Sequence, residues 1–163
     1  MRLKSIVVIA LIVALAPMGA DGQILTERNI SLQLALSIAQ AAMAACKTDG
    51  YDVSVAVVDR AGDLKVMLRA DTANPHNADL ARRKAYTSRT FKVPSMDVAK
   101  RTNGPTELSG QRFLVDVIPL GGGLPINIGN DTIGALGISG SPTQEGDEKC
   151  ATAALASVAN SLK

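Results

Sequence analysis

His76, the single histidine of this 163-residue chain, has the widest chemical repertoire of its side chains. It follows Asn74 and Pro75 in a loop that leads into a helical pattern. A neutral imidazole is the commonest transition-metal ligand in proteins and a usual axial ligand of haem iron. His76 is therefore our candidate metal ligand. The alternative is a loop histidine that caps the next helix or faces water, since no second metal ligand lies near it in the sequence.

A basic segment follows the histidine. Residues 82–101 hold seven Lys and Arg side chains and a single acid, Asp97. Such a segment can hold the carboxylates of an organic anion, including haem propionates, through charge-assisted hydrogen bonds. The alternative is a solvated helix face, which is the usual position of lysine and arginine. Lys84 differs from the others because it shares a helix face with Ala81, Ala85 and Ser88. We expect it to reach a pocket or to pair with an acid across a sheet.

The glycine-rich segment 119–125 does not have the features of a phosphate-binding loop. It has no Gly-Lys-Ser/Thr ending, and a strand pattern rather than a helix follows it. Gly134, Gly137 and Gly140 do not have the spacing of a dinucleotide fingerprint either. We interpret them as places where a helix or another backbone approaches the sheet closely.

The sequence contains no recognisable catalytic set. It lacks an HExxH zinc motif and a G-x-S-x-G nucleophile elbow. A Cys/His pair would need Cys46 or Cys150, and both fall inside predicted helices. The acids Asp147 and Glu148 fall in the first turn of a predicted helix, where carboxylates favour the helix dipole.

Helices and strands alternate in a way that predicts the α/β (α+β) class, with the order α-β-β-α-α-β-β-β-α. Helical patterns cover 31–47, 77–91, 95–102 and 143–161, and extended patterns cover 51–59, 63–70, 112–118, 125–129 and 132–139. We expect a single five-stranded antiparallel sheet with helices packed on it, the first and last on one face. The predicted apolar stripe of the first helix is Leu32, Leu36, Ala39, Met43 and Cys46.

The first 22 residues have the layout of a signal peptide. A basic start is followed by the apolar run 6–16, then Pro17 and small residues. We expect residues 23–163 to form a single exported domain, periplasmic or extracellular, with no membrane span after cleavage. The mature chain carries 15 basic and 14 acidic side chains. This near balance gives no reason to expect nucleic acid as a partner.

The two cysteines leave two alternatives open. Cys46 lies late in the first predicted helix and Cys150 early in the last. A disulfide between them requires these helices to pack side by side and antiparallel, with Cα atoms within about 7 Å. Otherwise they are two small buried residues that never meet.

Several segments resemble the GlcG/HbpS-like family of haem-binding or haem-degrading domains, over about residues 30–160. The resembling segments are Val57-Val58-Asp59 with Gly62, Arg69 with Asp71, Pro75-His76, the string 82–87, Gly122–Pro125, and Gly137–Ser141 with Asp147. The resemblance implies a profilin-like fold and a ligand cleft bordered by the Gly122–Pro125 loop. The candidate ligand-binding residues are His76, Arg83, Lys84, Thr87, Gly122, Gly123, Leu124 and Pro125, with His76 as the haem iron ligand.

Three functions compete. The first is an exported, homo-oligomeric protein that binds a small ligand, haem or a related cofactor. The second is an oligomeric structural or interaction module that partners another exported or sensory protein. The third is an enzyme acting on a small organic acid or on haem, and no triad, metal cluster or nucleotide loop in the sequence supports it.

Overall fold

The computed structural model describes residues 24–162. The predicted signal peptide, residues 1–22, lies outside this range. Within the range, no helix is both long enough and apolar enough to cross a bilayer. The described elements are α1 (Leu32–Thr48), β1 (Ser54–Asp59), β2 (Leu64–Arg69), α2 (Asn77–Phe91), α3 (Ser95–Arg101), η1 (Ser109–Phe113), β3 (Gly123–Ile128), β4 (Asp131–Ser139), α4 (Gln144–Ser157) and η2 (Ala159–Ser161).

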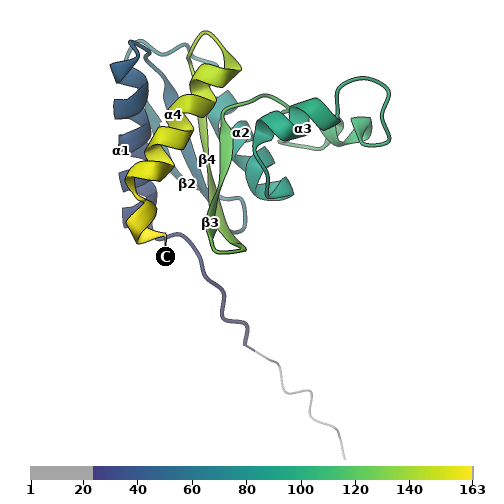
Figure 1. Cartoon of the computed structure of the whole chain (residues 1–163), viewed down its shortest axis with the longest axis horizontal. Helices are drawn as coiled ribbons and strands as arrows, with labels where there is room; N and C mark the ends of the chain where they lie inside the picture. Colours follow the sequence, from purple (N-terminus) through teal and green to yellow (C-terminus); the bar gives the residue numbers. More distant parts are fainter. Residues whose placement is uncertain (1–23, 163) are drawn as a thin grey trace, which may run out of the picture.

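The strands form one antiparallel sheet in the order β2-β1-β4-β3, with helices on both faces (Figure 1). The chain thus places its first strand beside its last, and the two central strands are the most deeply buried. This confirms the predicted mixed fold with an antiparallel sheet. The first and last helices share one face, as expected, and α2 covers the other.

Small residues bring α1 and α4 close to the sheet and to each other. The buried face of α1 consists of Ala35, Ile38, Ala39, Ala42 and Cys46. The predicted stripe is therefore only partly right, since Leu32 is 61 % exposed. α1 and α4 run side by side and antiparallel (Figure 1), and Cys46 is disulfide-bonded to Cys150 with a Cα–Cα distance of 5.3 Å. The open question about the cysteines is answered in favour of the bond.

On the opposite face, two glycines let α2 lie almost directly on the sheet. Gly123 of β3 pairs with Gly137 of β4 across the strands. A Cβ atom on Gly137 would overlap the carbonyl oxygen of Ala81 and lie 2.6 Å from the backbone nitrogen of Ala85. A Cβ atom on Gly123 would overlap the carbonyl oxygen of Lys84. Close approach of a helix, as the sequence indicated for Gly137, is the reason for both glycines.

The prediction of a fifth strand over 112–118 is wrong. This stretch begins in the short η1 helix and continues as a loop, and the sheet has four strands within the described residues. Asp116 has a left-handed backbone (φ 64°), which interrupts an extended run. In addition, side chains of α2 form hydrogen bonds with the backbone groups of this stretch that would otherwise pair with a neighbouring strand. Arg83 donates to the carbonyl of Val117, and the Thr87 hydroxyl accepts from the N–H of Ile118.

The segment from α3 to residue 118 projects from the body of the domain (Figure 1). This segment carries four exposed apolar side chains that we call the apolar tip: Leu108, Phe113, Leu114 and Val115. Phe113 is 83 % exposed and Val115 is 84 % exposed. Three of the four are consecutive, and neighbouring exposed apolar side chains indicate a contact surface more often than scattered single ones do.

Candidate functional site

A small open cavity lies where β4 ends and α2 and α4 begin. Its volume is about 240 Å³. The lining is mostly polar and consists of Asn74, His76, Asn77, Leu80, Lys84, Ser139, Gly140, Ser141, Pro142, Thr143, Gln144 and Asp147. The loop before α2 and the loop before α4 therefore meet at one end of the sheet. We call this space the His76 cavity.

A buried ion pair forms the inner wall of the His76 cavity. The Nζ atom of Lys84 lies 2.7 Å from Oδ2 of Asp147, and it also donates to the carbonyl of Ile138 at 3.0 Å. The two side chains are 4 % and 5 % exposed. The other Asp147 oxygen accepts from the backbone N–H of Ser141. Lys84 comes from α2 and Asp147 from α4, so the pair connects the helices of both sheet faces.

His76 lies at the rim of the cavity. It immediately precedes α2, but its side chain makes no capping hydrogen bond to that helix. The residue is exposed. The alternative role as a helix cap is therefore not observed, and the imidazole is accessible to a molecule approaching from outside. No group of three His, Cys, Asp or Glu side chains in residues 24–162 is arranged to hold a metal ion, so His76 would act as a lone protein ligand.

The glycine segment lies behind the ion pair rather than in the cavity wall. A Cβ atom on Gly122, whose φ is +107°, would lie 2.7 Å from Cβ of Asp147 and 3.2 Å from Nζ of Lys84. The N–H of Gly121 donates to Oε1 of Gln144, and the N–H of Gly123 donates to Oγ of Ser95. Because these amides are bonded to side chains, the segment anchors α3 and α4 to the edge of the sheet.

Glu148 lies near the same glycine segment on its α4 side. Burial of this carboxyl, and then the nearby Asp97 carboxylate, raise its pKa above the usual value, while Lys100 and the Gly122 N–H act against the shift. The Oε2 atom is buried without a hydrogen-bond partner among the described residues. Ionisation of Glu148, in the first half of α4, is therefore energetically unfavourable. This carboxylate does not line the His76 cavity.

The structure brings some of the predicted site residues together and separates others. His76 and Lys84 line one cavity, and Gly122 touches the ion pair from behind. Arg83 and Thr87 instead bind the backbone of residues 117 and 118. Gly123 packs under α2, and Leu124 packs on the core between the sheet and the helices α1 and α4. Pro125 lies in the edge strand β3. Their part in ligand binding stays a prediction.

Sequence reasoning missed most of the lining residues, including the three buried polar ones Asn77, Ser139 and Asp147. Asn77 follows the histidine directly and lies two helical turns before Lys84, a spacing that places both on one face of α2. Ser139 and Asp147 fall in segments that carry the family resemblance. An argument from the resemblance could therefore have included them, whereas single-residue chemistry could not.

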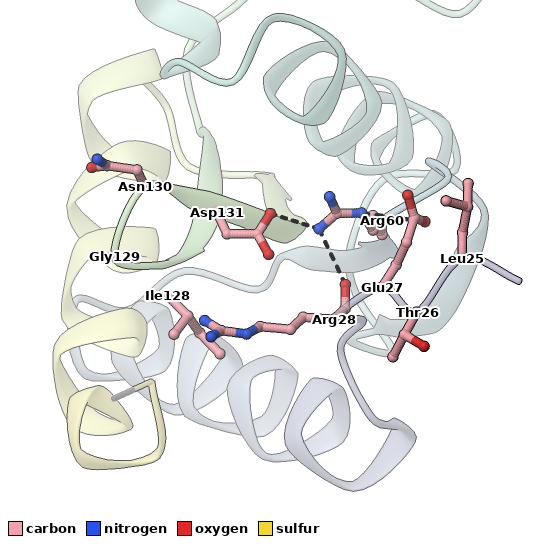
Figure 2. Close-up of a pocket in the computed structure, with 9 residues that line it drawn as sticks. All are labelled: Leu25, Thr26, Glu27, Arg28, Arg60, Ile128, Gly129, Asn130 and Asp131. Carbon is pink, nitrogen blue, oxygen red and sulfur yellow. Dashed lines mark hydrogen bonds and ion pairs between the residues drawn. The ribbon is translucent and has the colours of Figure 1, made fainter. Parts of the chain in front are cut away.

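A larger pocket, of about 780 Å³, lies at the opposite end of β4 (Figure 2). Arg60 occupies its centre, between residues 25–28 and the β3–β4 turn. Its guanidinium lies 2.6 Å from Oδ1 of Asp131, 3.2 Å from the carbonyl of Arg28 and 3.4 Å from Glu27. The bond to Asp131 raises the pKa of Arg60. These bonds connect the segment before α1 to the sheet. The Arg60 guanidinium is already paired with protein groups, so it is not a free binding group for a ligand.

The residues around His76 suit iron ligation but do not suit enclosure of a haem. An exposed imidazole with no internal partner is a ready axial ligand. The cavity, however, is smaller than the roughly 300–1,000 Å³ typical of cofactor and drug pockets, and its lining is mostly polar. The whole chain has only four aromatic side chains. A macrocycle held by His76 would therefore lie against the surface, outside the cavity.

Comparison with known proteins gives consistent matches. The model of the family described as haem degrading protein HbpS-like matches residues 30–156. An uncharacterised 15.0 kDa protein in the dhaT-dhaS intergenic region of Citrobacter freundii is 31 % identical over 129 residues, which cover 78 % of this chain and 90 % of that protein. A double mutant of HbpS from Streptomyces reticuli has a similar crystal structure, with 34 % identity and a TM-score of 0.80, covering 89 % and 98 % of the two chains. The crystal structure of a PduOC:heme complex matches with 27 % identity and a TM-score of 0.73, covering 78 % of this chain and 94 % of that one.

Proposed function

This chain belongs to the HbpS-like family of haem-degrading proteins, and from that premise we propose that it is an exported protein that binds haem or a related cofactor through His76. The single observation that carries the proposal is an exposed imidazole, free of any capping bond, at the mouth of a cavity. The solved PduOC:heme complex, a relative at 27 % identity, supports it. The signal-like layout of residues 1–22 supports export.

The residues that would hold the cofactor are few. His76 would supply the iron ligand, and Pro75 and Leu80 would supply apolar surface beside it. A bound haem would contribute its own redox and ligand-binding chemistry. We propose no reaction for this chain, and its own residues bind and orient the cofactor.

Replacement of His76 by alanine is expected to abolish histidine-type ligation of haem. Haemin is titrated into untagged protein, because an affinity tag would add histidines to a chain that has a single one. Wild type should give a sharp, shifted Soret band, since an imidazole nitrogen replaces a weaker axial ligand of the iron. The His76→Ala variant should bind haemin at least about tenfold more weakly.

The matched control is Asp71→Ala, an exposed loop residue that lies outside the His76 cavity. It should titrate like wild type. If wild type and His76→Ala give the same weak, featureless spectra, His76 is not a haem ligand and the proposal fails.

We also propose that the protein self-associates through the apolar tip. The supporting observation is the exposure of Phe113 and Val115 within the projecting segment. An oligomer would bury these side chains, and a monomer leaves them in water.

The double variant Phe113→Ser/Val115→Ser is expected to have a smaller mass in solution than wild type. Each substitution removes apolar surface from the contact, worth about 25 cal/mol per Å² buried. Light scattering coupled to gel filtration measures the mass. Leu32→Ser is the control, because Leu32 is 61 % exposed and belongs to α1, which lies on the side of the domain away from the projecting segment (Figure 1). A wild-type monomer, or an oligomer that keeps its mass in the double variant, would contradict this role of the tip.

A further inference from the structure

Two largely buried polar side chains line the His76 cavity and have no side-chain hydrogen bond to another described residue, although their polar atoms are still reached by solvent. Asn77 and Ser139 are each 4 % exposed, and both line the cavity. Within the part of the chain that the structure describes, neither the Asn77 amide nor the Ser139 hydroxyl bonds to another residue. Buried polar groups in proteins are nearly always hydrogen-bonded to protein, water or ligand. Water or another small molecule in the cavity therefore completes the hydrogen bonding of these two side chains.

Lys84 supplies a third group at the same place. An ammonium has three N–H donors, and Ile138 and Asp147 accept two of them. Asn77 and Lys84 lie two turns apart on the same face of α2, and Ser139 lies at the end of β4. Three hydrogen-bonding groups from two rigid elements thus converge on one small space. Sites built on helices and strands hold such groups in fixed positions.

The charges in the wall favour a neutral ligand. Asp147 lies 2.7 Å from Lys84 and compensates its charge, and both side chains are almost fully buried. An anion or cation placed against this pair would find no uncompensated counter-charge in the inner wall, and the loss of water around its own charge would be unfavourable. The size of the cavity limits the ligand further. At about 240 Å³ it is smaller than the roughly 300–1,000 Å³ of drug-sized ligand pockets, so it encloses only a few heavy atoms of a ligand.

We propose that the His76 cavity binds a small neutral molecule with neighbouring hydroxyl groups, a short polyol in chemical class. A hydroxyl group both donates and accepts at one atom. It can therefore accept from the Asn77 amide or from Lys84 while it donates to the Asn77 oxygen or to Ser139. This binding requires no iron and is separate from haem binding, which involves the outer surface at His76.

The test uses haem-free, isotope-labelled protein in buffer that contains no polyol. Glycerol is the neutral probe, and glycerate is the matched probe that keeps the three-carbon frame and adds a negative charge. Amide NMR spectra follow the side-chain NH₂ of Asn77 and the backbone of residues 139–141. We expect glycerol to move these signals along a saturating curve, and glycerate to bind at least about tenfold more weakly.

Substitutions of the lining residues test whether glycerol binds in the His76 cavity. Asn77→Ala should weaken glycerol binding at least about tenfold, and Ser139→Ala should weaken it to a smaller extent. Asn103→Ala, an exposed asparagine outside the cavity, should bind like wild type. If Asn77→Ala fails to fold, Ser139→Ala and the pair of probes still decide the question. Shifts that grow with glycerol without saturating, or tighter binding of glycerate than of glycerol, would overturn the proposal. The haemin titration of His76→Ala is a separate readout, so each proposal can fail alone.

Discussion

Replacement of Gly137 by alanine is expected to destabilise the domain by more than about 4 kcal/mol, an exceptional value for adding one methyl group. The added Cβ would overlap the carbonyl oxygen of Ala81 and lie 2.6 Å from the nitrogen of Ala85. Both atoms belong to the backbone of α2, so no side-chain rotation can relieve the overlap. α2 would have to move away from the sheet, and the packing between Ala81, Ala85, Ala135 and Val58 would be lost.

Thermal or urea unfolding followed by circular dichroism measures this loss. The matched control is Gly110→Ala, because nothing lies within 4 Å of a Cβ at that position and its φ is not positive. That variant should unfold within about 0.5 kcal/mol of wild type. A Gly137→Ala protein as stable as the control would show that α2 does not lie as close to the sheet as described.

The two close-approach glycines show what sequence reasoning can and cannot reach. The strand pattern around Gly137 indicates close approach, because a glycine inside a strand usually marks a bulge, a bend or a backbone contact. The family resemblance places Gly123 in a ligand loop instead. Its cross-strand pairing with Gly137 depends on the register between β3 and β4, which no single-strand pattern reveals.

The error over 112–118 has a similar origin. The apolar residues 113–115 are a plausible strand by composition, but a strand also needs a neighbour for its backbone groups. Here Arg83 and Thr87 of α2 take up the backbone at residues 117 and 118. The same two residues were predicted to bind a ligand. A polar side chain on a helix gives no sign in the sequence of whether it serves a ligand or a neighbouring loop.

The buried face of α1 shows how packing distance can override hydrophobicity. The periodic pattern favoured Leu32, Leu36 and Met43, yet the fully buried positions are mainly alanines and Cys46. Helices that pack at short range need small side chains at the contact. Cys46 fits this contact and reaches Cys150, a geometry that the sequence could only state as a condition.

Replacement of Lys84 by methionine is expected to cost about 3–5 kcal/mol of stability, because it leaves the Asp147 carboxylate buried without its cation. Asp147→Asn should have a cost of the same order, since it leaves the ammonium uncompensated. The double variant Lys84→Met/Asp147→Asn should recover most of the loss. Methionine matches the lysine stem, and asparagine keeps an oxygen to accept from the N–H of Ser141.

The chain contains its own control for this cycle in the exposed pair Lys149–Asp49. The two pairs have the same chemistry and nearly the same length, 2.8 Å against 2.7 Å, but the Lys149 side chain is 70 % exposed and Lys84 only 4 %. Breaking the exposed pair should cost no more than about 1 kcal/mol, because water solvates whichever charge remains. Equal coupling energies in the two cycles would mean that water reaches Lys84 and Asp147 as freely as it reaches the surface. The inner wall of the cavity would then be an open, solvated surface, and the argument for a neutral ligand, which depends on burial of that pair, would fail with it.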